Sequence, residues 1–245
     1  AQTEIVVSEE LCATGQISRS VCDQRGEFVT SLVGYTVNWD RRNDPIRPTR
    51  GFDLTARQDF AGLGGDVKYV RSELEGTAYY GIRPEWTVSL GGQVGYVESF
   101  GGDRVRINDR FFKGGNTFRG FENLGLGPRD TLNNEPLGGK AYAIGTLELS
   151  FPTPLPEEYG IEGALFIDVG TVGMLDDRDK LTRDVSGALV PDPFIRDDLS
   201  LRAAAGLSVF WDSPLGPIRL DFSQVLAKED YDQTETFRFS QTTRF

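Results

Sequence analysis

Residues 68–80, KYVRSELEGTAYY, are followed after a short Pro-containing turn by residues 86–97, WTVSLGGQVGYV. Apolar and polar side chains alternate along both stretches, so that Val70 and Leu74 share one face of the first while Glu73 lies on the other. Successive side chains of a β-strand point to opposite faces. This period of two therefore predicts two antiparallel strands joined by a tight turn.

The same alternation recurs along most of the chain, and no convincing helical pattern interrupts it. Nine strands are predicted, over 28–39, 51–60, 68–80, 86–97, 139–151, 161–172, 201–211, 217–226 and 236–245. A chain of 245 residues fits a single all-β unit, because such folds often run to roughly 200–250 residues.

Strand length, face chemistry and connection length together favour an antiparallel transmembrane β-barrel. The predicted strands run to ~10–13 residues, against ~5–6 for an average strand, with one apolar face and one that repeatedly carries charge. Short connections at 81–85, 152–160 and 212–216 alternate with long ones at 98–138 and 173–199, as in outer-membrane barrels. The alternative is a soluble antiparallel barrel or sandwich whose polar face meets water.

Composition excludes several classes of function. With 26 Lys and Arg against 37 Asp and Glu, the net charge of -11 argues against a nucleic-acid partner. The absence of histidine removes Ser-His-Asp and Cys-His catalysis and His-bearing zinc sites. The acidic run Asp176, Asp177, Asp179 lacks the pattern of a calcium loop, and Glu157 with Glu158 is interpreted as surface charge. We therefore expect no enzyme activity, no metal and no cofactor.

Cys12 and Cys22 lie in the polar stretch LCATGQISRSVC. A loop disulfide in an oxidising compartment is the favoured interpretation, and two free thiols are the alternative. Residues 1–27 are interpreted as the remnant of an extracellular loop. Nine strands would leave the two chain ends on opposite sides, whereas barrels have even strand numbers, so we expect further N-terminal strands outside this sequence.

Five motifs, in order along the chain, resemble the BamA family of outer-membrane assembly factors, with alphaproteobacterial members the most similar. They are NWDRRNDPIRPTRGF (38–52), GGNTFRGFENLGLGPRD (114–130), FIDVGTVG (166–173), WDSPLGPIRLDFSQVL (211–226) and FRFSQTTRF (237–245). The last departs from the family pattern, because SQTT (240–243) stands where a glycine is common between the aromatic residues.

The resemblance implies that residues 28–245 are the C-terminal part of a sixteen-strand barrel, with about nine of its strands and with loop 98–138 carrying the RGF motif. It implies a non-enzymatic function in the bacterial outer membrane, where β-barrel proteins are folded and inserted through a lateral seam by strand augmentation. Implied partners are unfolded β-barrel clients, membrane lipid and assembly lipoproteins bound mainly by a POTRA region absent from this sequence. Open strand edges also predict self-association. The alternatives are a TamA-like or two-partner-secretion translocation barrel, or a passive pore.

The resemblance also designates site residues. The family places the loop arginine inside the barrel against carboxylates, and alternation predicts that Glu148 and Asp168 face inward. The expected latch loop is Phe118, Arg119, Gly120 and Phe121; its expected partners are Glu148 and Asp168; the expected seam strand carries Phe237, Phe239 and Phe245. Whether Arg119 only stabilises the loop or also helps to move substrate stays open.

Overall fold

The computed structural model of the chain describes residues 2–183, 186–213 and 216–241. These residues form one large antiparallel sheet of ten strands, ordered β1-β2-β3-β4-β5-β8-β9-β13-β14-β15. The strands are β1 (Gln2–Ile5), β2 (Gly26–Asp40), β3 (Arg50–Gly65), β4 (Tyr69–Arg83), β5 (Trp86–Ser99), β8 (Ala141–Pro152), β9 (Ile161–Gly173), β13 (Arg202–Ser213), β14 (Gly216–Ala227) and β15 (Phe237–Gln241).

The first eight predicted strands are present, and the ninth, predicted over 236–245, is present over 237–241, with 242–245 outside the described residues. Each of the nine pairs with its neighbours in chain order. The register keeps apolar side chains together: Leu74 of β4 pairs with Ala56 of β3 and with Val94 of β5. Leu74 is 43% exposed and Leu90 of β5 is 61% exposed, so the apolar face is the outer one. This pattern is that of a barrel wall with lipid outside.

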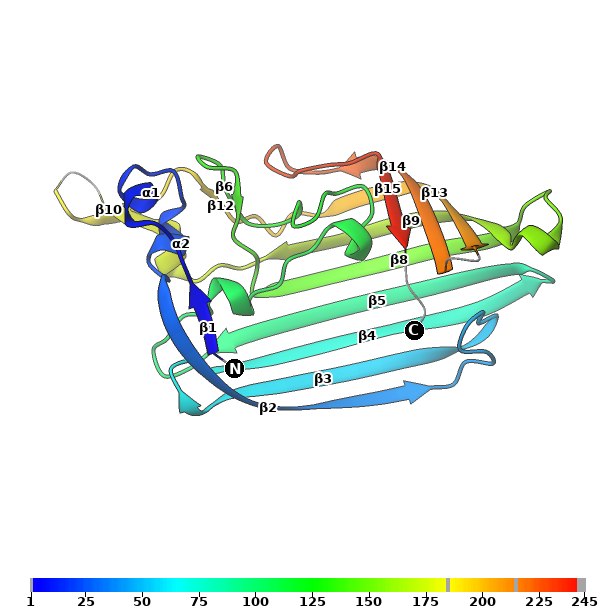
Figure 1. Cartoon of the computed structure of the whole chain (residues 1–245), viewed down its shortest axis with the longest axis horizontal. Helices are drawn as coiled ribbons and strands as arrows, with labels where there is room; N and C mark the ends of the chain where they lie inside the picture. Colours follow the sequence, from blue (N-terminus) through cyan, green and yellow to red (C-terminus); the bar gives the residue numbers. More distant parts are fainter. Residues whose placement is uncertain (1, 184–185, 214–215, 242–245) are drawn as a thin grey trace.

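The sheet is strongly curved, and the long connection between β5 and β8 lies within its concave side (Figure 1). The buried cluster joins inward-facing strand residues such as Tyr142 to loop residues such as Phe111, Phe118 and Phe121. The Phe111 and Tyr142 rings meet edge to face, with their centroids 4.7 Å apart. The loop therefore packs against the inner face of the curved wall.

The two ends of the sheet differ. The turns β4–β5 and β8–β9 lie at one end of the sheet, where β13 also ends and β14 begins (Figure 1). This end is called the short-turn end. The smaller elements gather mostly at the opposite end, which is called the long-loop end. The smaller elements are the helices α1 (Glu9–Ala13) and α2 (Arg19–Cys22), the 3-10 turns η1 (Ile107–Asp109), η2 (Gly115–Thr117), η3 (Glu157–Tyr159) and η4 (Asp177–Lys180), and the short strands β6 (Arg129–Asp130), β7 (Glu135–Pro136), β10 (Leu181–Arg183), β11 (Leu189–Pro191) and β12 (Ile195–Arg196).

Residues 2–27, within the predicted loop remnant 1–27, contain regular secondary structure. Strand β1 pairs with the first residues of β2, Gly26 to Val29, and helices α1 and α2 follow it. The sequence did not predict these elements, because strands and helices of four or five residues carry too little periodicity to be recognised.

Both edges of the sheet are largely open within the described residues. Strand β15 pairs only with β14, and β2 is covered by β1 only over its first four residues. No helix in the described part of the chain is both long and apolar enough to cross a membrane.

Candidate functional site

The glycine-rich loop 114–130 places Arg119 against two carboxylates of the barrel wall. Arg119 donates from Nε to Asp168 Oδ2 and from Nη2 to Asp168 Oδ1, at 2.7 Å in both cases. Its Nη1 donates to Glu148 Oε2 at 2.5 Å, and its backbone N–H donates to Asp168 Oδ2 at 3.2 Å. The guanidinium group thus uses its planar fork, a geometry that an ammonium group cannot reproduce.

Strand register builds the surface that receives this arginine. On β8 and β9, Thr146 pairs with Asp168 and Glu148 pairs with Phe166, so all four side chains face the concave side together. Thr146 Oγ1 donates to Asp168 Oδ1 at 2.8 Å. The Arg119 Cζ atom lies 3.5 Å from the centroid of the Phe166 ring, which adds a cation–π contact to the ion pairs.

A second arginine joins the cluster from β14. Arg219 Nη2 donates to Glu148 Oε2 at 3.3 Å, and its Nε donates to Asp221 Oδ1 at 2.8 Å. Ser208 of β13 donates a short hydrogen bond to Asp221 and accepts one from Arg219 Nη2 at 3.1 Å. The ion network therefore spans strands β8, β9, β13 and β14.

Burial makes the pairing of Arg119 necessary. Arg119 is 6% exposed and Asp168 is 2% exposed, and an unpaired charge at such a position would be strongly destabilising. Burial opposes the charged form of the guanidinium, but hydrogen bonds and charge from Asp168 and Glu148 outweigh it and raise the pKa of Arg119. Arg119 therefore stays protonated and can serve as a permanent anchor.

The residues beside Arg119 fit the loop against β13 and β14. Gly120 has a φ of 88°, a region that favours glycine, and a Cβ there would lie 3.0 Å from Ala204 Cβ and 3.2 Å from Val225 Cγ2. Phe118 and Phe121 are buried, and their rings meet edge to face with centroids 5.1 Å apart. The four predicted latch residues thus lie in one segment that packs against the wall.

The docked loop also contacts the last described strand and the connection that leads to it. Glu235, in the connection 228–236, donates its backbone N–H to the Gly120 carbonyl at 3.0 Å. Ser240 of β15 donates from Oγ to Asn116 Oδ1 at 2.8 Å. One loop therefore links β8 and β9 to the edge strand β15.

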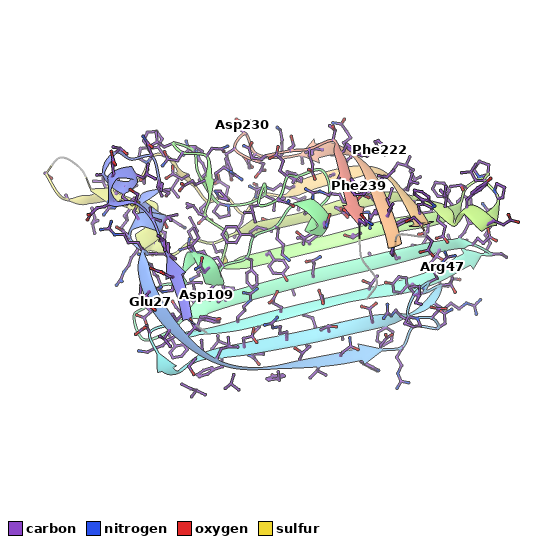
Figure 2. All side chains as sticks on the ribbon, in the orientation of Figure 1. Glu27, Arg47, Asp109, Phe222, Asp230 and Phe239 are labelled. Carbon is purple, nitrogen blue, oxygen red and sulfur yellow. A yellow bond between two sulfur atoms is a disulfide. The ribbon has the colours of Figure 1, made fainter. Side chains whose placement is uncertain are left out.

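The two predicted seam residues that the structure describes lie on the outer surface. Phe237 and Phe239 of β15 are 50% and 54% exposed, and the Phe237 ring lies 5.2 Å from the ring of Phe222 on β14. Figure 2 labels Phe222 and Phe239 on these neighbouring strands. Phe245 lies outside the described residues.

The remaining predicted site residues do not join the arginine cluster. Cys12 and Cys22 form a disulfide with an S–S distance of 2.11 Å, in the N-terminal segment. The described residues contain no group of three or more His, Cys, Asp or Glu side chains placed to hold a metal ion.

Sequence reasoning missed Arg219, Asp221, Thr146 and Phe166. Alternation assigns all four to the inward face, but it does not say which inward residues meet. One usable signal was Phe166, an aromatic residue on the inward face of its strand, two positions before Asp168. The cluster as a whole is suited to holding a loop through charge-assisted hydrogen bonds.

Comparison with known proteins places this geometry in a family. The Omp85 superfamily domain matches residues 4–245. The chain is 31% identical over 232 residues to the outer membrane protein assembly factor BamA of Neorickettsia risticii (strain Illinois), covering 94% of this chain and 29% of that protein. It is 28% identical to the BamA of Neisseria meningitidis serogroup B, covering 90% of this chain and 30% of that protein. It is also 32% identical over 157 residues to the human sorting and assembly machinery component 50 homolog, covering 63% of this chain and 33% of that protein.

The fold agrees with a solved structure. The crystal structure of BamA from Haemophilus ducreyi lacking POTRA domains 1-3 superposes with a TM-score of 0.76 at 24% identity, over 88% of this chain and 42% of that one. The chain spans about a third or less of the length of these curated relatives. By its domain match, its relatives and its fold, the chain belongs to the Omp85 superfamily, as a BamA-family β-barrel of the bacterial outer membrane.

Proposed function

We propose that this barrel helps other β-barrel proteins to fold and insert into the outer membrane. The relatives named as assembly factors support this proposal. So does the edge of β15, which within the described residues pairs only with β14, since a strand edge without a neighbouring strand offers backbone donors and acceptors to an incoming strand. In this proposal the client strand adds to an edge by hydrogen bonding, and no covalent chemistry is needed.

The observation that carries the proposal is the fork of Arg119 on Asp168 and Glu148. A wall built only to enclose a passive pore would not need a buried arginine to hold a loop across its interior. The same loop contacts β15 through Asn116. We propose that Arg119 keeps the loop docked so that β15 is held in position at the edge where a client strand would add.

Proposed partners follow from the two surfaces. The apolar outer face meets membrane lipid, and the edge of β15 meets unfolded β-barrel clients. Assembly lipoproteins are proposed to bind mainly through a POTRA region, as the family resemblance implies.

The test uses the protein at its full natural length, reconstituted in phospholipid vesicles and mixed with a urea-unfolded β-barrel client. The folded, heat-resistant fraction of the client is followed on gels over time. We expect faster folding than in protein-free vesicles, and slower folding with Arg119→Ala than with Arg196→Ala, a control at an exposed arginine of β12.

Two other outcomes would identify the alternatives. A passive pore would release a small trapped dye without accelerating client folding. A translocation barrel would move the client into the vesicle interior, where it would be protected from protease without becoming heat-resistant. Either result would overturn the assembly function.

A further inference from the structure

Residues 8–24 form a compact segment, here called the hook, that contains α1, α2 and the Cys12–Cys22 disulfide. The two helices have five and four residues, and helices this short do not persist in water by themselves. The shape of the hook must therefore come from its cross-link and from the surfaces that it touches.

The hook binds a buried ion pair at the long-loop end. Ser20 Oγ donates to Asp179 Oδ1 at 2.8 Å, and both residues are buried. Asp179 also forms an ion pair with Arg110, and the side chains of both residues are fully buried. Arg104 Nη1 forms a second ion pair with Asp179 Oδ1 at 3.2 Å. The hydroxyl group of the hook thus completes the hydrogen bonding of a carboxylate that water does not reach.

Arg110 connects this ion pair to the loop that carries Arg119. Its Nε donates to the Val105 carbonyl and its Nη1 to the Leu137 carbonyl, both at 3.1 Å. Residues 105–110 and 135–137 are therefore held side by side near the two ends of the loop 98–138. They are called the neck of that loop below.

The hook contacts both halves of the neck directly. The Ile107 N–H donates to Gln24 Oε1, and the Ser18 N–H donates to Glu135 Oε2, each at 2.8 Å. Gln24 in turn donates from Nε2 to the Ser20 carbonyl at 3.0 Å. The residues that reach the neck lie within α2 or within two residues of it, close to Cys22.

The second long loop, between β9 and β13, contacts both the neck and the hook. The Val105 N–H donates to Asp176 Oδ2 at 2.9 Å, and Arg19 Nη1 donates to Thr182 Oγ1 at 3.3 Å. The hook therefore stands where two loops, each between different pairs of barrel strands, are joined to one another.

We propose that the Cys12–Cys22 disulfide is a clasp whose closure holds the neck and thereby orders the loop that carries Arg119. The clasp closes by thiol–disulfide exchange: the two thiols transfer two electrons and two protons to the disulfide of an oxidant, which becomes a dithiol. When a dithiol reductant reverses this exchange, α1 no longer holds α2 in place. Ser20 and Gln24 then leave the neck, and the neck opens.

The test is amide hydrogen exchange on the protein at full natural length in phospholipid nanodiscs, with and without dithiothreitol. Reduction is expected to speed exchange in 105–110, 135–137 and 115–121, with β3, β4 and β5 unchanged. The double variant Cys12→Ser/Cys22→Ser should show the same pattern without reductant. If that variant fails to fold, reduction of the folded wild type still decides the question.

Two disulfide-intact variants separate the cross-link from the contacts. Ser20→Ala/Gln24→Ala should loosen the neck although the disulfide remains, whereas Thr14→Ala should not, because Thr14 Oγ1 bonds only to carbonyls within the hook. The proposal is overturned if reduction speeds exchange only within 8–24, or changes nothing. Because these measurements involve no client protein, they stand independently of the assembly function.

Discussion

Arg119 and Asp168 lie 49 positions apart in the sequence, and both carboxylate oxygens of Asp168 accept a hydrogen bond of 2.7 Å from the Arg119 guanidinium. The backbone N–H of Arg119 adds a third bond to the same carboxylate. A glycine-rich loop has a large conformational entropy to lose on docking. The three hydrogen bonds from Arg119 to the Asp168 carboxylate oppose that loss of entropy.

Replacing Arg119 with alanine is expected to undock the loop without disrupting the strands. Removing one partner of a buried ion pair costs roughly 3–5 kcal/mol, and the loop can leave the wall at a smaller cost than unfolding the sheet. Limited proteolysis should show new cleavage within 114–121, and Arg119→Lys should give an intermediate rate, since one ammonium group cannot form the fork. Equal protection of wild type and Arg119→Ala would contradict the latch.

The two carboxylates are expected to differ in importance. Asp168 accepts three hydrogen bonds from Arg119 and one from Thr146, whereas Glu148 accepts one from each of two arginines. Hydrogen bonds to charged groups contribute about 1.5–3 kcal/mol each, so Asp168→Asn should expose the loop to protease more than Glu148→Gln does. If Glu148→Gln exposes the loop to protease more than Asp168→Asn does, Glu148 and not Asp168 is the main partner of Arg119.

Gly120→Ala tests the close approach of the loop to the wall. Its Cβ would lie 3.0 Å from Ala204 Cβ, so both backbone strain and crowding oppose it. Gly102→Ala is a matched control, because Gly102 has a similar φ of 84° with nothing within 4 Å of the added atom. Thermal unfolding and proteolysis should show a larger effect at 120 than at 102. Equal effects at the two positions would mean that backbone strain alone, and not the contact with Ala204, causes the loss of stability.

The chain of 245 residues, purified in detergent, is expected to form dimers or larger assemblies. Within the described residues, the outer edge of β15 and that of β2 beyond Thr30 have no neighbouring strand, and such edges recruit other chains. Light scattering after size-exclusion chromatography measures the mass, and amide exchange along 31–40 reports whether the β2 edge is covered. A monodisperse monomer would contradict this prediction.

Alternation along the sequence was sufficient to predict the long strands and their inner and outer faces. Leu74 and Leu90 lie outside as predicted, since in both strands apolar residues recur on one face over ten residues or more. Pairings between distant segments carry no such periodic signal. Three features depend on the tertiary arrangement of distant segments: strand β1, the contact of Arg219 with Glu148, and the contact of Ser20 with Asp179. No local pattern in a single sequence reveals such an arrangement.

For the candidate site, the sequence predicted the class of contact but not its full extent. Arg119 drew attention because it lies among glycines in a motif shared with a known family, and Glu148 and Asp168 because they face inward. Arg219 also faces inward and lies within the motif 211–226, but nothing in the sequence says which inward carboxylate it contacts. Its distance from Glu148 is fixed by the curvature of the sheet between β8 and β14, which local sequence does not specify.

The most direct test of the central claim is a double-mutant cycle on the client-folding rate, with Arg119→Ala, Asp168→Ala and the double variant in the full-length protein. If Arg119 and Asp168 act as one unit, either substitution removes the whole contribution of the pair, and the double variant folds the client no more slowly than the slower single variant. If the two losses instead multiply, the residues act independently, and the account of Arg119 docking the loop through Asp168 is contradicted.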